Sequence, residues 1–198
     1  MEWDEVDAVI AQATLELLIE EQSGDMEFIQ RFQGSSSVGF LISSIDTVYR
    51  HFHIKWAARS GESANFDSFY LRFNFDNGAN YNYAMQRMLA GTAAMAGSID
   101  QGENELVILG GIAGSTAPTS RHNSGFLDII NAQNNSGADK VIHGLGLGVR
   151  SGTDSTHEIR RYQGQWLNTS DDITAIEIAT TSIEDFTSQS FFDLYGIR

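Results

Sequence analysis

Residues 71–83 read LRFNFDNGANYNY, and this stretch determines how the chain is expected to fold. Apolar and polar side chains alternate through residues 69–75, so that one face of a strand would carry Phe69, Leu71, Phe73 and Phe75. A period of two is typical of a β-strand with one buried face. Asp76, Asn77 and Gly78 follow, and Asn and Gly tolerate the positive φ of hairpin turns. The stretch therefore predicts two strands joined as a β-hairpin.

The same loop has an alternative interpretation, because Asp76, Asn77 and Asn80 carry oxygen atoms of the kind that calcium prefers. An EF-hand-type loop would continue with a glycine at its sixth position and a glutamate at its twelfth, and helices would flank it. Here strands are expected on both sides, and Met85, Gln86 and Arg87 follow instead. We predict a turn and no metal ligands, with a calcium site as the alternative.

Ten further short segments alternate in the same way and are bounded by Gly, Ser, Asn or Asp. The clearest covers residues 52–56, where Phe52, Ile54 and Trp56 face opposite to His53 and Lys55. The others cover residues 27–33, 38–43, 81–88, 105–109, 126–131, 141–149, 158–162, 173–179 and 191–197. About eleven strands at such spacing predict an all-β fold, and a β-sandwich is the natural interpretation.

The first residues show a different period. Apolar side chains at spacings of three and four predict a helix over residues 2–22, which Ser23 and Gly24 would end. We therefore divide the chain into an N-terminal helical arm (1–25) and a β-sandwich domain (26–198). The apolar stripe either packs on its own domain or contacts other copies or another protein, which makes interface candidates of Trp3, Val6, Ile10 and Leu17.

Composition excludes several classes of function. The 198 residues carry a formal charge of −14, and residues 1–30 hold nine acids and no Lys or Arg. Nucleic acid is an unsuitable partner, since duplex binding depends on clustered Lys and Arg side chains that contact the phosphates. The apolar runs are far shorter than a membrane span, and the acidic N-terminus does not resemble a secretion signal. Without cysteine the chain has neither disulfides nor thiolate metal sites.

Residues 144–148 read GLGLG, which suggests a phosphate-binding loop at first sight. A dinucleotide fingerprint lies between a strand and a helix, whereas these glycines lie within an alternating run. His143, Leu145, Leu147 and Val149 would share one face, and the other would be nearly bare backbone. Such a face permits close approach of another layer or another subunit. We therefore add interface candidates at Gly144, Gly146 and Gly148.

No catalytic constellation is evident in the sequence. His51 and His53 would lie on one side of a strand, but a third zinc ligand is not indicated, so we expect surface histidines. A nucleophile elbow is missing, and a thiol mechanism is excluded without cysteine. Paired carboxylates for glycoside hydrolysis stay open, although solvent or turn positions are expected for the adjacent acids Asp171, Asp172, Glu184 and Asp185. We predict no catalytic residues and no cofactor.

Three blocks together resemble a group of tailed-bacteriophage virion proteins. They are SSIDTVYRHFHIKWAARS (43–60), LRFNFDNGANYNY (71–83), and ITAIEI (173–178) followed by FTSQSFFDLYGIR (186–198). The group has a strand near a Tyr-Arg turn, an LRFN-D-G-NY hairpin and a terminal strand close to SLYGI, in this order. The resemblance covers about residues 28–198. Asp193 departs from it, since the group more often has a small polar residue there.

The resemblance implies a jelly-roll-like antiparallel β-sandwich on the exterior of a virion, often as a trimer. We accordingly expect a non-enzymatic capsid decoration (cement) protein that is made in the bacterial cytoplasm and bridges or coats capsid subunits. Its partners would be the major capsid protein or tail proteins and its own copies in a homotrimer, without nucleic acid or membrane. One alternative is a tail-fibre, adaptor or glycan-binding virion component. Another is a depolymerase that uses paired carboxylates.

Overall fold

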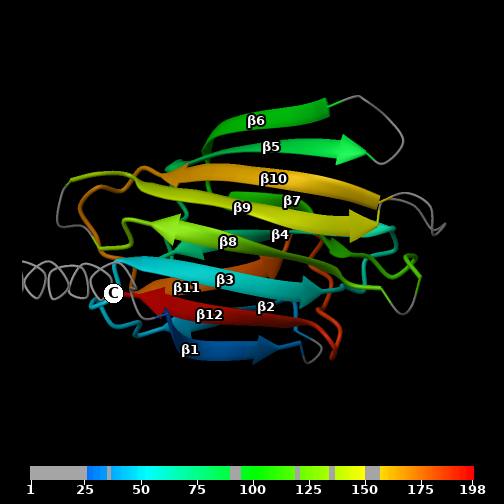
Figure 1. Ribbon diagram of the computed structural model, residues 1–198, viewed down its shortest axis with the longest axis horizontal. Coiled ribbons are helices and arrows are strands. Elements are labelled where there is room, and N and C mark those ends of the chain that lie inside the picture. Colours follow the sequence, from blue (N-terminus) through cyan, green and yellow to red (C-terminus); the bar gives the residue numbers. More distant parts are fainter. Residues whose placement is uncertain (1–25, 35–36, 90–94, 119–120, 134–136, 150–156) are drawn as a thin grey trace, which may run out of the picture.

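The computed structural model describes residues 26–34, 37–89, 95–118, 121–133, 137–149 and 157–198. These residues form twelve β-strands and no helix (Figure 1). In chain order the strands are β1 (Met26–Gln33), β2 (Gly39–Ser43), β3 (His51–Ala58), β4 (Phe66–Phe73), β5 (Tyr81–Leu89), β6 (Met95–Glu103), β7 (Leu106–Ala113), β8 (Asn123–Ile130), β9 (Lys140–Val149), β10 (His157–Trp166), β11 (Ala175–Thr180) and β12 (Phe191–Ile197). A helix suited to crossing a membrane is not found among the described residues.

The strands form two sheets that lie one behind the other in Figure 1. The larger sheet has eight strands in the order β1-β12-β3-β8-β9-β10-β5-β6, and the smaller has four in the order β2-β11-β4-β7. All ladders between these strands are antiparallel. The predicted all-β sandwich is therefore confirmed. The jelly-roll connectivity stays a prediction, and the predicted helical arm (1–25) lies outside the described residues.

Every one of the eleven predicted strands corresponds to a strand of the structure, and the one that was missed is β6. Gly97, Ser98, Asp100, Gln101 and Gly102 interrupt the alternation of β6 with small and polar residues. This strand lies at the edge of the larger sheet and pairs with β5 alone. An edge strand tolerates such a sequence because only one of its sides forms a ladder.

The predicted hairpin at residues 71–83 is wrong, although the turn is present. Its two strands belong to different sheets, because β4 pairs with β7 and β11, whereas β5 pairs with β6 and β10. The chain changes direction at Asn74 and Phe75, with φ of 51° and 60°. Phe75 lies beyond the end of β4 and is 61% exposed, so the prediction that it shares the buried face of Phe73 is also wrong.

The Asp76 carboxylate holds this corner between the sheets. Its Oδ1 accepts the backbone N–H of Gly78 at 2.9 Å, and its Oδ2 accepts Nδ2–H of Asn80 at 2.9 Å and Nε1–H of Trp166 at 2.7 Å. Burial opposes the charge of Asp76, but these hydrogen bonds outweigh it and lower the pKa of Asp76. Both oxygens thus have partners within the chain, in agreement with the predicted turn.

The core lies between the two sheets. Phe52, Ile54 and Trp56 of β3 share one face, as predicted, and all three are buried. The rings of Trp56 and Phe69 meet edge to face at 5.2 Å. Because such a side chain contributes about 1.5–3 kcal/mol when it is fully buried, this layer contributes much of the stability. It also fixes which side of the larger sheet is turned away from the core.

Candidate interaction surface

The side of the eight-stranded sheet that faces away from the smaller sheet is the most distinctive surface of the protein, and we call it the outer face. Eight of its side chains are large, apolar and more than a third exposed: Met26, Phe28, Met88, Ile99, Val141, Leu145, Leu147 and Ile159. They come from β1, β5, β6, β9 and β10, which span the sheet from edge to edge. Extended exposed apolar surface of this kind is typical of interaction sites.

The alternation of β9 places exposed apolar side chains on one of its faces and mostly glycine on the other. Ile142, Gly144 and Gly146 point inward and are buried, whereas Val141, Leu145 and Leu147 point outward. A Cβ on Gly144 would lie 2.1 Å from the carbonyl oxygen of Phe126, so that β9 passes close to its neighbours only because glycine is there. The leucines consequently occupy the outer face, where Leu147 is 59% exposed.

A small polar cluster lies in the middle of the outer face. Nδ1 of His53 is 2.5 Å from Oδ1 of Asp128, and Nε2 of His143 is 3.4 Å from Oδ2 of the same carboxylate. The imidazole of His53 also stacks on Phe126, with ring centroids 5.6 Å apart. Both imidazoles thus contact the Asp128 carboxylate directly, at hydrogen-bond or ion-pair distances. Nowhere in the described ranges do three or more His, Cys, Asp or Glu side chains form a group that could hold a metal ion.

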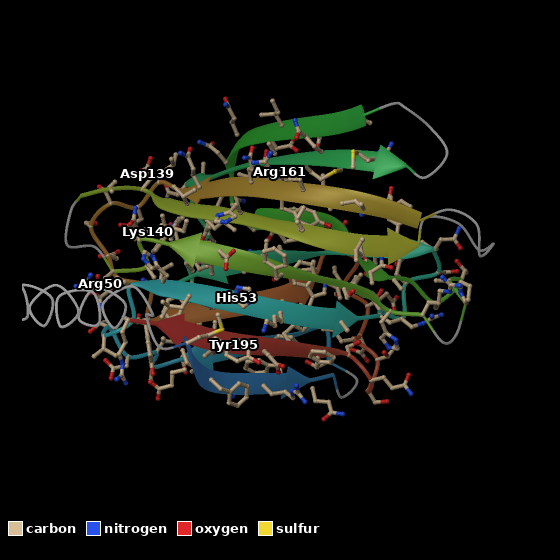
Figure 2. All side chains as sticks on the ribbon, viewed as in Figure 1. Arg50, His53, Asp139, Lys140, Arg161 and Tyr195 are labelled. Atoms are coloured by element: carbon tan, nitrogen blue, oxygen red, sulfur yellow. The ribbon has the colours of Figure 1, made fainter. Side chains whose placement is uncertain are left out.

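The remaining charges of the outer face are few and mostly paired. Arg31 donates to Asp193 through two hydrogen bonds of 2.6 and 2.7 Å. Nζ of Lys55 lies 4.9 Å from the ring centroid of Tyr195. Figure 2 shows that His53, Tyr195 and Arg161 come from β3, β12 and β10, across the width of the sheet. The outer face therefore combines an apolar surface with a nearly balanced set of charges.

Two hollows lie at opposite sides of the outer face. One of about 310 Å³ is lined from β5, β6, β9 and β10, and its polar lining residues include four amides (Asn82, Gln101, Gln163 and Gln165) together with Asp100 and His143. The other measures about 760 Å³ and lies over β1, β12, β3 and β8, with Trp56 and Phe126 in its lining. Leu145, Leu147 and Ile159 lie outside both linings and are exposed.

The candidate glycines occupy the inner side of this sheet. A Cβ on Gly146 would lie 3.0 Å from the ring of Tyr162, and one on Gly148 would lie 2.7 Å from the amide of Asn123. The close approach that they permit is thus to side chains of the same chain. A role for Gly144, Gly146 and Gly148 at a subunit interface stays a prediction, as does one for Trp3, Val6, Ile10 and Leu17, which lie outside the described residues.

His51 and His53 lie on the outward side of β3, but the His53 side chain is only 12% exposed, unlike the predicted surface histidine, and each imidazole has a separate partner. Nδ1 of His51 accepts the backbone N–H of Asn131 at 3.2 Å, whereas His53 contacts Asp128. Burial, followed by the charge of Arg50, lowers the pKa of His51. The two imidazoles therefore do not act as a joint ligand pair in this arrangement.

Carboxylates come together at a different place, on the outward side of the smaller sheet. Arg72 lies between Glu105 and Glu177, with N–O distances of 3.0 and 2.9 Å, and Tyr70 donates its hydroxyl to Glu177 at 3.2 Å. Burial raises the pKa of Glu105. One guanidinium thus holds both carboxylates, and this links β4 and β11 to the turn that precedes β7. The adjacent acids Asp171, Asp172, Glu184 and Asp185 lie in the connections around β11, outside the strands.

The exposed apolar residues were missed by sequence reasoning for a physical reason. Alternation predicted that Leu145 and Leu147 share a face, but an apolar face in an amphipathic strand is ordinarily the buried one. The signal lay in the bare glycine side of β9, because a strand that presents glycine to the core leaves its leucines outside.

The chain matches no protein-family model and no curated protein.

Proposed function

We propose that this chain is a non-enzymatic structural protein of a tailed-bacteriophage particle, in which it coats or bridges capsid subunits. The outer face of the eight-stranded sheet is the observation that carries the proposal, because eight exposed apolar side chains across one sheet favour permanent contact with other proteins. The three sequence blocks that resemble phage virion proteins support the same role.

In this proposal the sandwich acts as a rigid, jelly-roll-like block. Its outer face makes contacts between protein subunits, and the acidic arm (1–25) serves as an anchor or a trimer contact. The major capsid protein or a tail protein would be the other partner. Such a role needs a rigid surface and no reacting group, which is consistent with carboxylates and imidazoles that are paired within the chain at Asp76, Arg72 and Asp128.

The test is the number of copies of this chain in purified phage particles, measured by gel densitometry against the major capsid protein. A decoration protein is expected at a ratio of the order of one copy per capsid subunit or per few subunits. A few copies per particle would indicate a tail component, and no copies would contradict a virion role.

A second candidate function, glycan binding by a tail or adaptor component, is favoured by the smaller hollow. Gln165, Asn82 and Gln101 lie side by side on β10, β5 and β6, and Gln163 is one outward position further along β10. Neutral amides both donate and accept hydrogen bonds, which suits the hydroxyl groups of a sugar. Binding to bacterial surface polysaccharide that is lost in Gln163→Ala/Gln165→Ala, and kept in Gln133→Ala, would favour this function.

A further inference from the structure

We propose that the outer face is covered by a second copy of this chain, so that the protein associates with itself through its eight-stranded sheet. The inference rests on the proposed function only in treating this face as an assembly surface. The proposed function leaves open whether the partner at this face is a second copy of the chain or another virion protein. The inference names a second copy.

The distribution of charge favours a second copy. The chain has 26 acids and 12 bases, but among the described residues the outer face carries only two acids (Asp128, Asp193) and three bases (Arg31, Lys55, Arg161). The described residues hold 17 acids and 11 bases in total, so the outer face contributes +1 and the other described residues contribute −7. Two acidic molecules repel each other over most of their surfaces. This face is one on which identical copies meet without that repulsion.

The extent of the face matches the needs of a stable interface. Eight strands about 4.8 Å apart and about eight residues long, at roughly 3.3 Å per residue, give a footprint of about 1,000 Å². Specific interfaces bury about 800 Å² on each partner. One copy can therefore cover most of the apolar side chains of another.

The relief of the face is also suited to self-association. Leu145, Leu147 and Ile159 form an exposed apolar group outside the linings of the two hollows. A surface that provides both exposed apolar side chains and hollows can pack against its own copy, with the apolar side chains of one molecule in a hollow of the next.

The experiment measures the mass of the full chain in solution by light scattering after gel filtration. Wild type is expected at a multiple of the 21.8 kDa chain mass. In Leu147→Asp/Ile159→Asp the dissociation constant of the multimer is expected to rise about a hundredfold or more, because packing would bury unpaired charges. The control Ile183→Asp changes a side chain that is 78% exposed away from this face, and it should keep the wild-type mass.

Folding is checked by circular dichroism, and a milder variant, Leu147→Ser/Ile159→Ser, replaces the first if that one does not fold. A wild-type mass of 21.8 kDa, or face variants that keep the multimer, would overturn the inference. So would a multimer that dissociates in Val6→Asp/Ile10→Asp and not in the face variants, because the arm would then hold the copies together.

The same variants separate this inference from the proposed function. If wild type is monomeric in solution but the face variants are lost from phage particles, another virion protein covers the face, and only the inference fails. If wild type is a multimer that depends on the face, yet purified particles do not contain the chain, the inference stands and the proposed function fails.

Discussion

At the scale of single residues, Asp76 shows what sequence reasoning can and cannot reach. The types and order of Asp76, Asn77 and Gly78 predicted a turn, and this was correct because those preferences are local. That Asp76 accepts the indole N–H of Trp166, 90 residues away, has no local signal. The positive φ of Phe75 was also unforeseeable, since an aromatic residue rarely adopts it and only the tertiary corner imposes it.

Asp76→Ala is expected to lower the free energy of unfolding by about 2–3 kcal/mol, because the buried N–H of Trp166 loses a charged acceptor. Urea denaturation measures the change. Asp46→Ala is the matched control: its carboxylate accepts one exposed backbone N–H, from Val48 at 3.1 Å, and its loss should cost about 1 kcal/mol or less. Equal losses in the two variants would contradict this account of the corner.

Calcium provides a second test of the same residue. Since both oxygens of Asp76 already accept hydrogen bonds, millimolar calcium should leave the melting temperature unchanged. A rise of several degrees that disappears in Asp76→Ala would instead support the calcium site.

The pH dependence of stability should report His51 and His122. Burial lowers the pKa of each below its ordinary value of 6.5, assisted by Arg50 and Arg59 respectively. The unfolded chain therefore binds protons at a higher pH than the folded one, and the free energy of unfolding should fall as the pH drops below about 6.5. Urea midpoints at pH 7.5 and 5.5 should differ less in His51→Gln/His122→Gln than in wild type. An unchanged difference would exclude these two groups as the cause.

At the scale of elements, alternation located the strands because it records which residues share a face. Alternation did not locate β6, because an edge strand does not need regularly spaced apolar residues. It also could not assign strands to sheets. β4 and β5 are neighbours in sequence and read as a hairpin, but whether two strands pair or cross to another layer depends on the other strands, β10 and β11, that compete for their edges.

The glycines of β9 allow a graded test of packing. Gly144→Ala places a methyl group 2.1 Å from the carbonyl oxygen of Phe126, which backbone movement must relieve, so we expect a loss of about 2–3 kcal/mol. In Gly146→Ala the nearest atoms are 3.0 Å away on the ring of Tyr162, which can move, and about 1 kcal/mol is expected. Guanidinium denaturation of both variants checks the order, and the reverse order would contradict the inward placement of Gly144.

At the scale of the whole molecule, composition and strand spacing were sufficient for a two-layer β-sandwich, because eleven short amphipathic strands bury their apolar faces in few other ways. The exposure of the outer face could not be predicted from the sequence. A sequence shows that Leu147 and Ile159 lie on one side of their strands, but not that the second sheet covers the opposite side. The candidate surface became visible only once the sheets were placed.

The central claim is that the outer face is covered in the assembled protein, and hydroxyl-radical footprinting of the assembled form tests it most directly. Labelling of Leu147 and Ile159 is compared with that of Ile183 and Phe75, which are exposed away from this face. We predict strong protection of Leu147 and Ile159 in the assembled form and unchanged labelling of Ile183 and Phe75. Leu147 and Ile159 labelled as readily as Ile183, whatever the assembly state, would contradict the claim.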